Sequence, residues 1–122
     1  MDDATRVLIV DDDRFVRMLL KDALSDGGYH FTEASDGEEA LEKLKADPQD
    51  VVLLDLFMPK MSGIEALTEI QRIAPGQKVL VISSLDSDAL VAQALQSGAA
   101  GFIQKPFHPL EIQAAVKKAL SA

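Results

Sequence analysis

The chain has 122 residues, a hydrophobic fraction of 48%, no cysteine and a net charge of −8. This length suits one domain with a sizeable core, the lack of cysteine excludes disulfides and thiolate metal sites, and the acidic balance argues against direct binding to nucleic acid. The apolar runs are only four or five residues long and the start is acidic, so we expect neither a membrane-spanning helix nor a signal peptide, but a cytoplasmic protein without membrane contacts.

Five short segments predict the strands of a sheet. In chain order they are 6–10 (RVLIV), 30–34 (HFTEA), 51–54 (VVLL), 78–82 (KVLVI) and 101–104 (GFIQ). The first, third and fourth are nearly continuous apolar runs rich in β-branched residues, which is typical of strands covered on both faces. The second and fifth have weaker patterns.

Amphipathic helical patterns separate these strands. Apolar residues at helical spacing are Ala40, Leu41 and Leu44, then Ile64, Leu67, Ile70 and Ile73, and finally Ile112, Ala115, Val116, Ala119 and Leu120. The order of strand then helix occurs five times. It predicts an α/β fold, a doubly wound parallel sheet with helices on both faces.

Three helix starts have recognisable sequence signals. Ser35 and Glu38 have the spacing of a capping box. Asp86 or Ser87 can cap the helix that follows the fourth strand, and Pro109 suits the first position of the last helix.

Polar side chains follow four of the five expected strands. Three consecutive carboxylates, Asp11 to Asp13, come after the first strand, although like charges about 4 Å apart repel by roughly 4 kcal/mol at an effective dielectric constant of about 20. Asp55 follows the third strand, Ser83 and Ser84 the fourth, and Lys105 the fifth. Ligands of such folds bind at the carboxyl ends of the strands. Carboxylates, a hydroxyl and an ammonium at this edge predict a site for Mg²⁺ and a phosphoryl group, and the cation offsets the repulsion.

These residues carry a family resemblance. The stretches VDDD (10–13), LLDLFMPKMSG (53–63), SS (83–84) and GFIQKPF (101–107) occur in the order and spacing of a response-regulator receiver domain. The chain resembles that family from Arg6 to about Leu120. The resemblance implies a flavodoxin-like five-stranded sheet of order 2-1-3-4-5 with five helices, and residues 1–122 are expected to form a single receiver domain.

The resemblance also implies residue roles. Asp55 is the expected phosphoacceptor. The expected Mg²⁺ ligands are Asp11, Asp12, Asp55 and the backbone carbonyl of Phe57, and the expected phosphoryl-binding and switch residues are Ser83, Lys105 and Phe102. The bond between Lys105 and Pro106 is expected to be cis. Asp13 is not required by the family and is expected to start the first helix, where the helix dipole favours an anion.

The implied function is a phosphorylation-dependent signalling switch and not an ordinary enzyme. A sensor histidine kinase or a phosphotransfer protein donates the phosphoryl group from a phosphohistidine. The response is a change on the face formed by the helix at 88–97, the strand at 101–104 and the last helix, for a downstream protein or a fused output domain. The helix at 88–97 has one acidic and no basic residue, which argues against the charged dimer face of the DNA-binding branch.

Two further surface features lead to hypotheses. The segment from Phe15 to Leu24 has more apolar positions than one buried stripe holds, so we expect Val16 or a neighbour to contact the kinase, with Arg14 and Arg17 steering an acidic partner. Phe57 and Leu85 stand at positions that tune dephosphorylation in the family. Neither can hydrogen-bond an attacking water, so we expect slow self-dephosphorylation unless both side chains point into solvent.

Alternative functions stay open at this stage. Asp11-x-Asp13 resembles the nucleophile motif of haloacid-dehalogenase-type phosphatases, although Phe15 stands where Thr or Val is expected and no acidic pair follows Lys105. A receiver-like interaction module that is not phosphorylated is a second alternative. A flavin-binding flavodoxin lacks support because no phosphate loop follows the first strand. His30 and His108 are expected at the surface, and the chain is either a free-standing receiver or a domain of a longer regulator.

Overall fold

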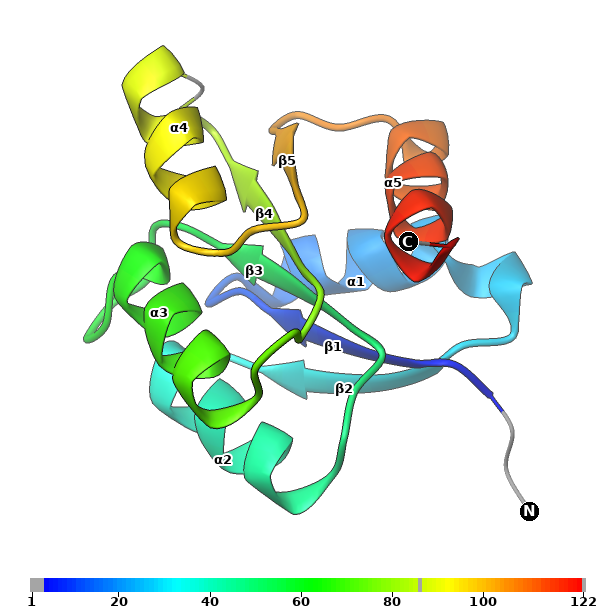
Figure 1. Ribbon diagram of the computed structural model, residues 1–122. Helices are drawn as coiled ribbons and strands as arrows, with labels where there is room; N and C mark the ends of the chain where they lie inside the picture. Colours follow the sequence, from blue (N-terminus) through cyan, green and yellow to red (C-terminus); the bar gives the residue numbers. More distant parts are fainter. Residues whose placement is uncertain (1–3, 86, 122) are drawn as a thin grey trace.

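A computed structural model of the chain describes residues 4–85 and 87–121. In these residues, five parallel strands form one sheet in the order β2-β1-β3-β4-β5 (Figure 1). The strands are β1 (Arg6–Val10), β2 (His30–Ala34), β3 (Val51–Asp55), β4 (Val79–Ser83) and β5 (Gly101–Gln104). This order confirms the expected flavodoxin-like topology.

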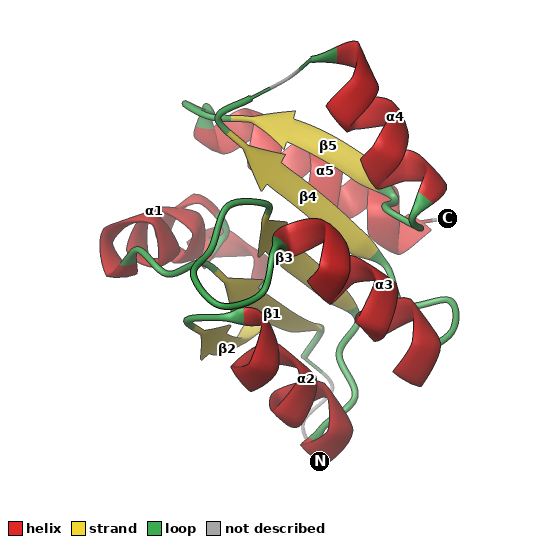
Figure 2. Cartoon of the chain, turned by 90° about the vertical axis from the view of Figure 1, so that its left-hand side faces the viewer, coloured by secondary structure: helices red, strands yellow, loops and turns green. Residues whose placement is uncertain are grey.

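Helices cover both faces of the sheet. They are α1 (Arg14–Ala23), α2 (Gly37–Ala46), α3 (Gly63–Ile73), α4 (Asp88–Gln96) and α5 (Pro109–Ser121), with a short 3₁₀ turn η1 (Ser25–Gly27) after α1. Figure 2 shows α2, α3 and α4 in front of the sheet, with α1 and α5 behind it. Among residues 4–85 and 87–121, no helix is both long and apolar enough to cross a bilayer.

The sheet divides the core into two layers. Along β1, Leu8 and Val10 pack with α2 and α3, whereas Val7 and Ile9 pack with α1 and α5. Successive strand residues point to opposite faces, so a strand buried on both sides must be apolar at nearly every position. This explains the continuous apolar runs of the central strands.

Two strands differ from the sequence prediction, each by one residue at a boundary or in register. β3 includes Asp55, and β4 runs from Val79 to Ser83 instead of 78–82. Both functional side chains, Asp55 and Ser83, are therefore the last residues of their strands. Their backbones are held by the sheet itself.

The helix starts confirm most of the predicted caps. Asp13 caps α1 by accepting a hydrogen bond from the Phe15 N–H, Ser87 caps α4, and Pro109 is the first residue of α5. Asp86 lies outside the described residues. The predicted capping box of Ser35 and Glu38 is wrong, because the side chain of Asp36 caps α2 by accepting from the Glu39 N–H at 2.8 Å.

Candidate functional site

Three carboxylates meet at the carboxyl ends of β1 and β3. Asp11 and Asp12 follow β1, and Asp55 ends β3 beside it in the sheet. One oxygen from each of the three carboxylates lies within 4.8 Å of those of the other two. Asp11 and Asp55 are buried and Asp12 is exposed, so the cluster is open to solvent on the side of Asp12.

The ammonium of Lys105 lies between the two buried carboxylates. Its Nζ is 3.0 Å from Asp11 Oδ2 and 3.4 Å from Asp55 Oδ1. The Lys105 N–H donates to the Ser83 carbonyl at 2.7 Å, which links the β5–α5 loop to the end of β4. The next peptide bond, to Pro106, is cis as expected. Lys105 thus offsets part of the repulsion among the clustered acids.

Burial and mutual repulsion shift the titration of this cluster. Burial, followed by the charge of Asp11, raises the pKa of Asp55 to about 6, against the opposing effects of Lys105 and the Phe57 N–H. The pKa of Lys105 is also raised: burial lowers it, but the hydrogen bond and charge of Asp11 and the charge of Asp55 together outweigh burial. A strand-end acid with such a shift is typical of a functional site.

The hydroxyl of Ser83 lies at the neighbouring strand end. The side chain is buried, and its Oγ accepts a hydrogen bond from the Leu85 N–H at 3.1 Å. A hydroxyl that accepts one bond still has its own hydrogen to donate. Phe102 does not join the cluster: it pairs with Val81 in the sheet, is half-buried, and packs against the core layer that contains Ala94 of α4.

The loop after β3 is shaped by a close backbone approach. The Gly63 N–H donates to the Leu56 carbonyl at 2.9 Å, which folds the loop back beneath Asp55. A Cβ at Gly63 would lie 2.3 Å from the Leu56 Cα and 2.6 Å from the Asp55 carbonyl oxygen. Only glycine fits here without moving the backbone that carries Asp55. This accounts for the glycine at the end of the LLDLFMPKMSG stretch.

The two positions expected to tune dephosphorylation lie at the rim of the site. The side chains of Phe57 and Leu85 are 50% and 56% exposed. Both residues are therefore in extensive contact with solvent. The Phe57 N–H donates to Asp55 Oδ1 at 3.4 Å, so the backbone of Phe57 follows the acid closely.

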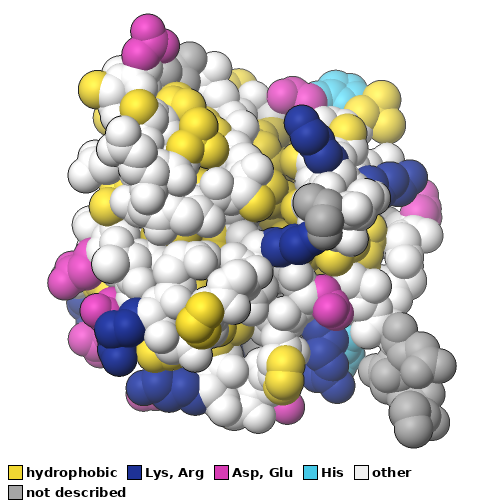
Figure 3. Space-filling model, viewed as in Figure 1, with side chains coloured by type: hydrophobic (Ala, Val, Ile, Leu, Met, Phe, Trp, Pro, Cys, Tyr) yellow, Lys and Arg dark blue, Asp and Glu magenta, His cyan; other side chains and the backbone are white. Residues whose placement is uncertain are grey.

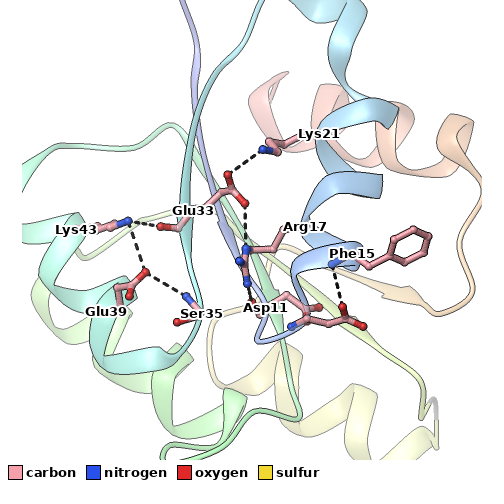
Figure 4. A network of polar contacts seen from close by, with 9 residues as sticks. Asp11, Phe15, Arg17, Lys21, Glu33, Ser35, Glu39 and Lys43 are labelled. Carbon is pink, nitrogen blue, oxygen red and sulfur yellow. Dashed lines mark hydrogen bonds and ion pairs between the residues drawn. The ribbon is translucent and has the colours of Figure 1, made fainter.

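A polar network beside the cluster was not predicted from the sequence (Figure 4). Glu33 near the end of β2 binds Arg17 and Lys21 of α1, and its carbonyl accepts a hydrogen bond from Lys43 of α2. The guanidinium of Arg17 binds Glu33 and the Asp11 carbonyl, whereas Arg14 is exposed, and the steering of an acidic partner by these two residues stays a prediction. The available signal was a carboxylate near the end of the strand beside β1, with Arg17 and Lys21 one helical turn apart.

The exposed apolar residues of α1 are neighbours of Val16 and not Val16 itself. Val16 is half-buried against the core, whereas Phe15, Met18 and Leu19 are exposed. The prediction of an exposed apolar patch on this helix is confirmed, with Phe15, the neighbour of Val16, as its most exposed member at 59%. The contact of this patch with a kinase stays a prediction.

The donor set fits a hard divalent cation. Three carboxylates with oxygens close together, one of them exposed, provide the oxygen ligands that Mg²⁺ prefers while leaving room for water and phosphate oxygens. No histidine belongs to this group, and the chain has no cysteine. The described residues therefore suit Mg²⁺ better than a softer transition metal.

Comparisons with known proteins agree with this geometry. The family model of the response regulator receiver domain matches residues 7–117. The chain is 46% identical over 114 residues to the chemotaxis protein CheY of Thermotoga maritima, covering 93% of this chain and 95% of that protein. It is 40% identical over 119 residues to CheY of Bacillus subtilis, covering 97% and 99%.

Solved structures agree as well. A CheY-like receiver domain protein of Methanospirillum hungatei superposes with a TM-score of 0.91 at 30% identity, covering 97% of this chain and 94% of that chain. A chain of the CheX–CheY–BeF3–Mg complex of Borrelia burgdorferi superposes with a TM-score of 0.90 at 37% identity, covering 93% and 87%. This chain belongs to the response regulator receiver domain family of two-component signalling systems.

Proposed function

We propose that residues 1–122 act as a single receiver domain that accepts a phosphoryl group on Asp55 from a phosphohistidine. The donor is a sensor histidine kinase or a phosphotransfer protein, and the reaction needs Mg²⁺. The observation that carries this proposal is the position of Asp55: a buried strand-end carboxylate beside Asp11 and Asp12, with the Lys105 ammonium 3.4 Å away.

The residues of the site have complementary roles in the transfer. An ionised oxygen of Asp55 attacks the phosphorus in line, a P–O bond forms, and the P–N bond breaks with its electron pair left on the imidazole nitrogen, which takes up a proton. Lys105 and the Ser83 hydroxyl stabilise the charge on the phosphoryl oxygens. Asp11, Asp12, Asp55 and the Phe57 carbonyl would hold Mg²⁺, which would supply further positive charge next to the phosphoryl oxygens.

The response to phosphorylation develops on the face of α4, β5 and α5. Ser83 is the last residue of β4 and Lys105 directly follows β5, so a phosphoryl group that binds both side chains pulls the ends of β4 and β5 together. Apolar side chains gather over α4 and toward β5, with basic side chains on the α5 side (Figure 3). A groove beside β5 is lined by Leu80, Gly101, Phe102, Ala115 and Lys118. Half-buried Phe102 joins this groove to the core layer beneath α4. This arrangement supports Phe102 as a switch residue for an output partner.

The kinase docks on the exposed apolar residues of α1. Phe15, Met18 and Leu19 lie on the helix that starts directly after Asp11 and Asp12, so a partner seated there has its phosphohistidine next to the acidic cluster. Exposed apolar patches of this kind often mark partner sites.

A small-molecule donor tests the proposal without a kinase. Acetyl phosphate with Mg²⁺ is expected to label the wild type on Asp55, and both Asp55→Asn and an excess of chelator are expected to abolish the label. Labelling is read by mass spectrometry at acid pH, where acyl phosphates survive. Full labelling of Asp55→Asn contradicts the assignment of the phosphoacceptor. A wild type that takes no label from acetyl phosphate or from phosphorylated kinases supports the unphosphorylated interaction module.

Hydrolysis of a generic phosphate ester by the wild type distinguishes a receiver from a phosphatase. A receiver is expected not to turn over a generic phosphate ester, whereas a haloacid-dehalogenase-type enzyme does so repeatedly. Sustained hydrolysis that depends on Asp11 contradicts the receiver mechanism.

A further inference from the structure

Arg17 is bound on both sides of its guanidinium. Its Nη1 donates to the backbone carbonyl of Asp11 at 2.7 Å, and its Nε donates to Glu33 Oε1 at 3.0 Å. The side chain is only 15% exposed although it lies on a surface helix. Figure 4 shows it crossing from α1 to the loop that carries Asp11 and to the end of β2. A planar guanidinium can make both bonds at once, which an ammonium cannot do in the same geometry.

Glu33 is a well-held anchor for this arginine. Its second carboxylate oxygen is 2.9 Å from Lys21 Nζ, and its own backbone carbonyl accepts from Lys43. The hydrogen bond from Lys21, followed by that from Arg17 and against the effect of burial, lowers the pKa of Glu33. Glu33 is thus a charged acceptor tied to α1, α2 and β2.

The carbonyl that Arg17 binds belongs to the peptide that leads to Asp12. A peptide unit is planar, so the direction of the Asp11 carbonyl sets the plane that contains the N and Cα of Asp12. The rest of Asp11 is held by other groups: its N–H donates to Ala34, and its carboxylate accepts from the Asp13 N–H and from Lys105. Arg17 fixes the remaining polar group of the residue.

Asp12 depends on this backbone for its orientation. Within residues 4–85 and 87–121, its carboxylate makes no hydrogen bond or ion pair that would aim it toward Asp11 and Asp55. Its oxygen nevertheless lies within 4.8 Å of theirs. The contacts that hold the Asp11–Asp12 peptide therefore place the Asp12 Cα, from which this carboxylate extends toward the cluster.

We infer that Arg17, anchored by Glu33, is a positioning residue that aims the Asp12 carboxylate at the metal site. The inference rests on the proposed function, because it takes Asp12 as an Mg²⁺ ligand. Groups that orient metal ligands from behind commonly contribute about tenfold or more to metal affinity.

The test compares Arg17→Met with Lys21→Met. Both variants remove one positive charge and one ion pair to Glu33, but only Arg17 contacts the Asp11 carbonyl. With Mg²⁺ alone as the probe in isothermal titration calorimetry, Arg17→Met is expected to raise the Kd about tenfold and Lys21→Met to change it less than about twofold. In metal-free protein, Arg17→Met is also expected to speed amide hydrogen exchange at Asp12 and Asp13 relative to the wild type.

Arg17→Lys separates geometry from charge. It keeps the cation but cannot make both bonds, so we expect it to bind Mg²⁺ nearly as weakly as Arg17→Met. A merely structural role would lower the free energy of unfolding of the variants and leave the Kd of the folded protein unchanged. Folded Arg17→Met with the wild-type Kd overturns the inference.

Two further outcomes are decisive in other ways. If Arg17→Met does not fold, Glu33→Gln takes its place, because this variant weakens the anchor of Arg17. The inference requires that Glu33→Gln raise the Kd for Mg²⁺ more than Lys21→Met does. Equal Kd values for the two variants overturn it. If the wild type itself binds no Mg²⁺, the proposed function fails, a result that differs from loss in the Arg17 variants alone.

Discussion

At the scale of single residues, the crowded carboxylates explain most of the site. Asp11 and Asp55 are buried close together, and Lys105 offsets only part of their repulsion. The remaining repulsion in the metal-free cluster therefore favours the binding of a cation or a proton. The same electrostatics that destabilise the empty site favour Mg²⁺ and the phosphoryl transfer that depends on it.

The raised pKa of Asp55 predicts a pH dependence of stability in chelator. Its ordinary value is 3.8 and its value in the fold is about 6, so between these pH values the folded protein holds a proton that the unfolded chain has lost. The stabilisation is complete below the ordinary pKa and is lost as the pH rises through about 6. From pH 5 to pH 7.5, Asp55 is expected to reduce the free energy of unfolding by about 1.4 kcal/mol.

Urea unfolding at pH 5 and pH 7.5 measures this pH-dependent contribution of Asp55 to the free energy of unfolding. Asp55→Asn cannot titrate at this position, so its stability advantage over the wild type is expected to grow between pH 5 and pH 7.5. Parallel pH profiles for the two proteins contradict the raised pKa.

We expect the rim residues Phe57 and Leu85 to influence the lifetime of the phosphorylated state. Neither side chain can orient a water molecule for attack on phosphorus, so Phe57→Asn and Leu85→Glu are expected to speed the loss of label from Asp55 several-fold. A tenfold change corresponds to only about 1.4 kcal/mol of barrier. The rate is followed after removal of the phosphodonor. Because both side chains are about half in solvent, equal rates in all three proteins would mean that water access is controlled elsewhere in the site.

At the scale of elements, two adjacent residues, Ser35 and Asp36, are candidates for the N-cap of α2. The Asp36 carboxylate accepts from the Glu39 N–H, and Lys60 Nζ lies 3.5 Å from it, whereas the Ser35 N–H donates to the Glu39 side chain. Asp36→Ala is expected to cost about 1 kcal/mol of unfolding free energy, as loss of an N-cap does. Ser35→Ala keeps its backbone N–H and is expected to change stability by only a few tenths of a kcal/mol, as at an uncoupled surface position. Urea denaturation of the two variants decides between the caps, and a larger loss in Ser35→Ala would reverse the assignment.

Some features of these elements can be predicted from the sequence and others cannot. Strand order, the acids at strand ends and Lys105 follow from patterns and a family resemblance, because buried parallel strands are nearly all apolar and end in polar residues. The cap of α2 was misplaced by one residue because Ser35 and Asp36 are both good capping types, followed by Glu38 and Glu39. The link from Arg17 to Glu33 depends on how α1 packs over the ends of β1 and β2. Arg17 and Lys21 at helical spacing are a local charge pattern, but the sequence does not show that the packing of α1 brings them to Glu33.

At the scale of the whole molecule, input and output use different surfaces. The exposed apolar residues of α1 lie on one side of the sheet, while α4 covers the other (Figure 2). The acidic cluster lies at the strand ends between these two layers. A partner on α1 can therefore deliver a phosphoryl group while the face of α4 and β5 remains free to change. This separation predicts that the two surfaces can be impaired independently.

Phe15→Ser tests the input surface, with Leu95→Ser of α4 as a matched control, since the two side chains are 59% and 49% exposed. Both changes remove a largely exposed apolar side chain and are expected to leave folding and labelling by acetyl phosphate unchanged. Phosphotransfer is measured with purified, phosphorylated histidine kinases of the source organism, at times short enough to follow the initial rate. With the kinase that labels the wild type fastest, Phe15→Ser is expected to slow the transfer about tenfold or more, as truncation of an interface hot spot does, and Leu95→Ser to leave it unchanged. Equal rates for Phe15→Ser and the wild type would remove Phe15 from the docking surface, and a slow Leu95→Ser would move that surface to α4.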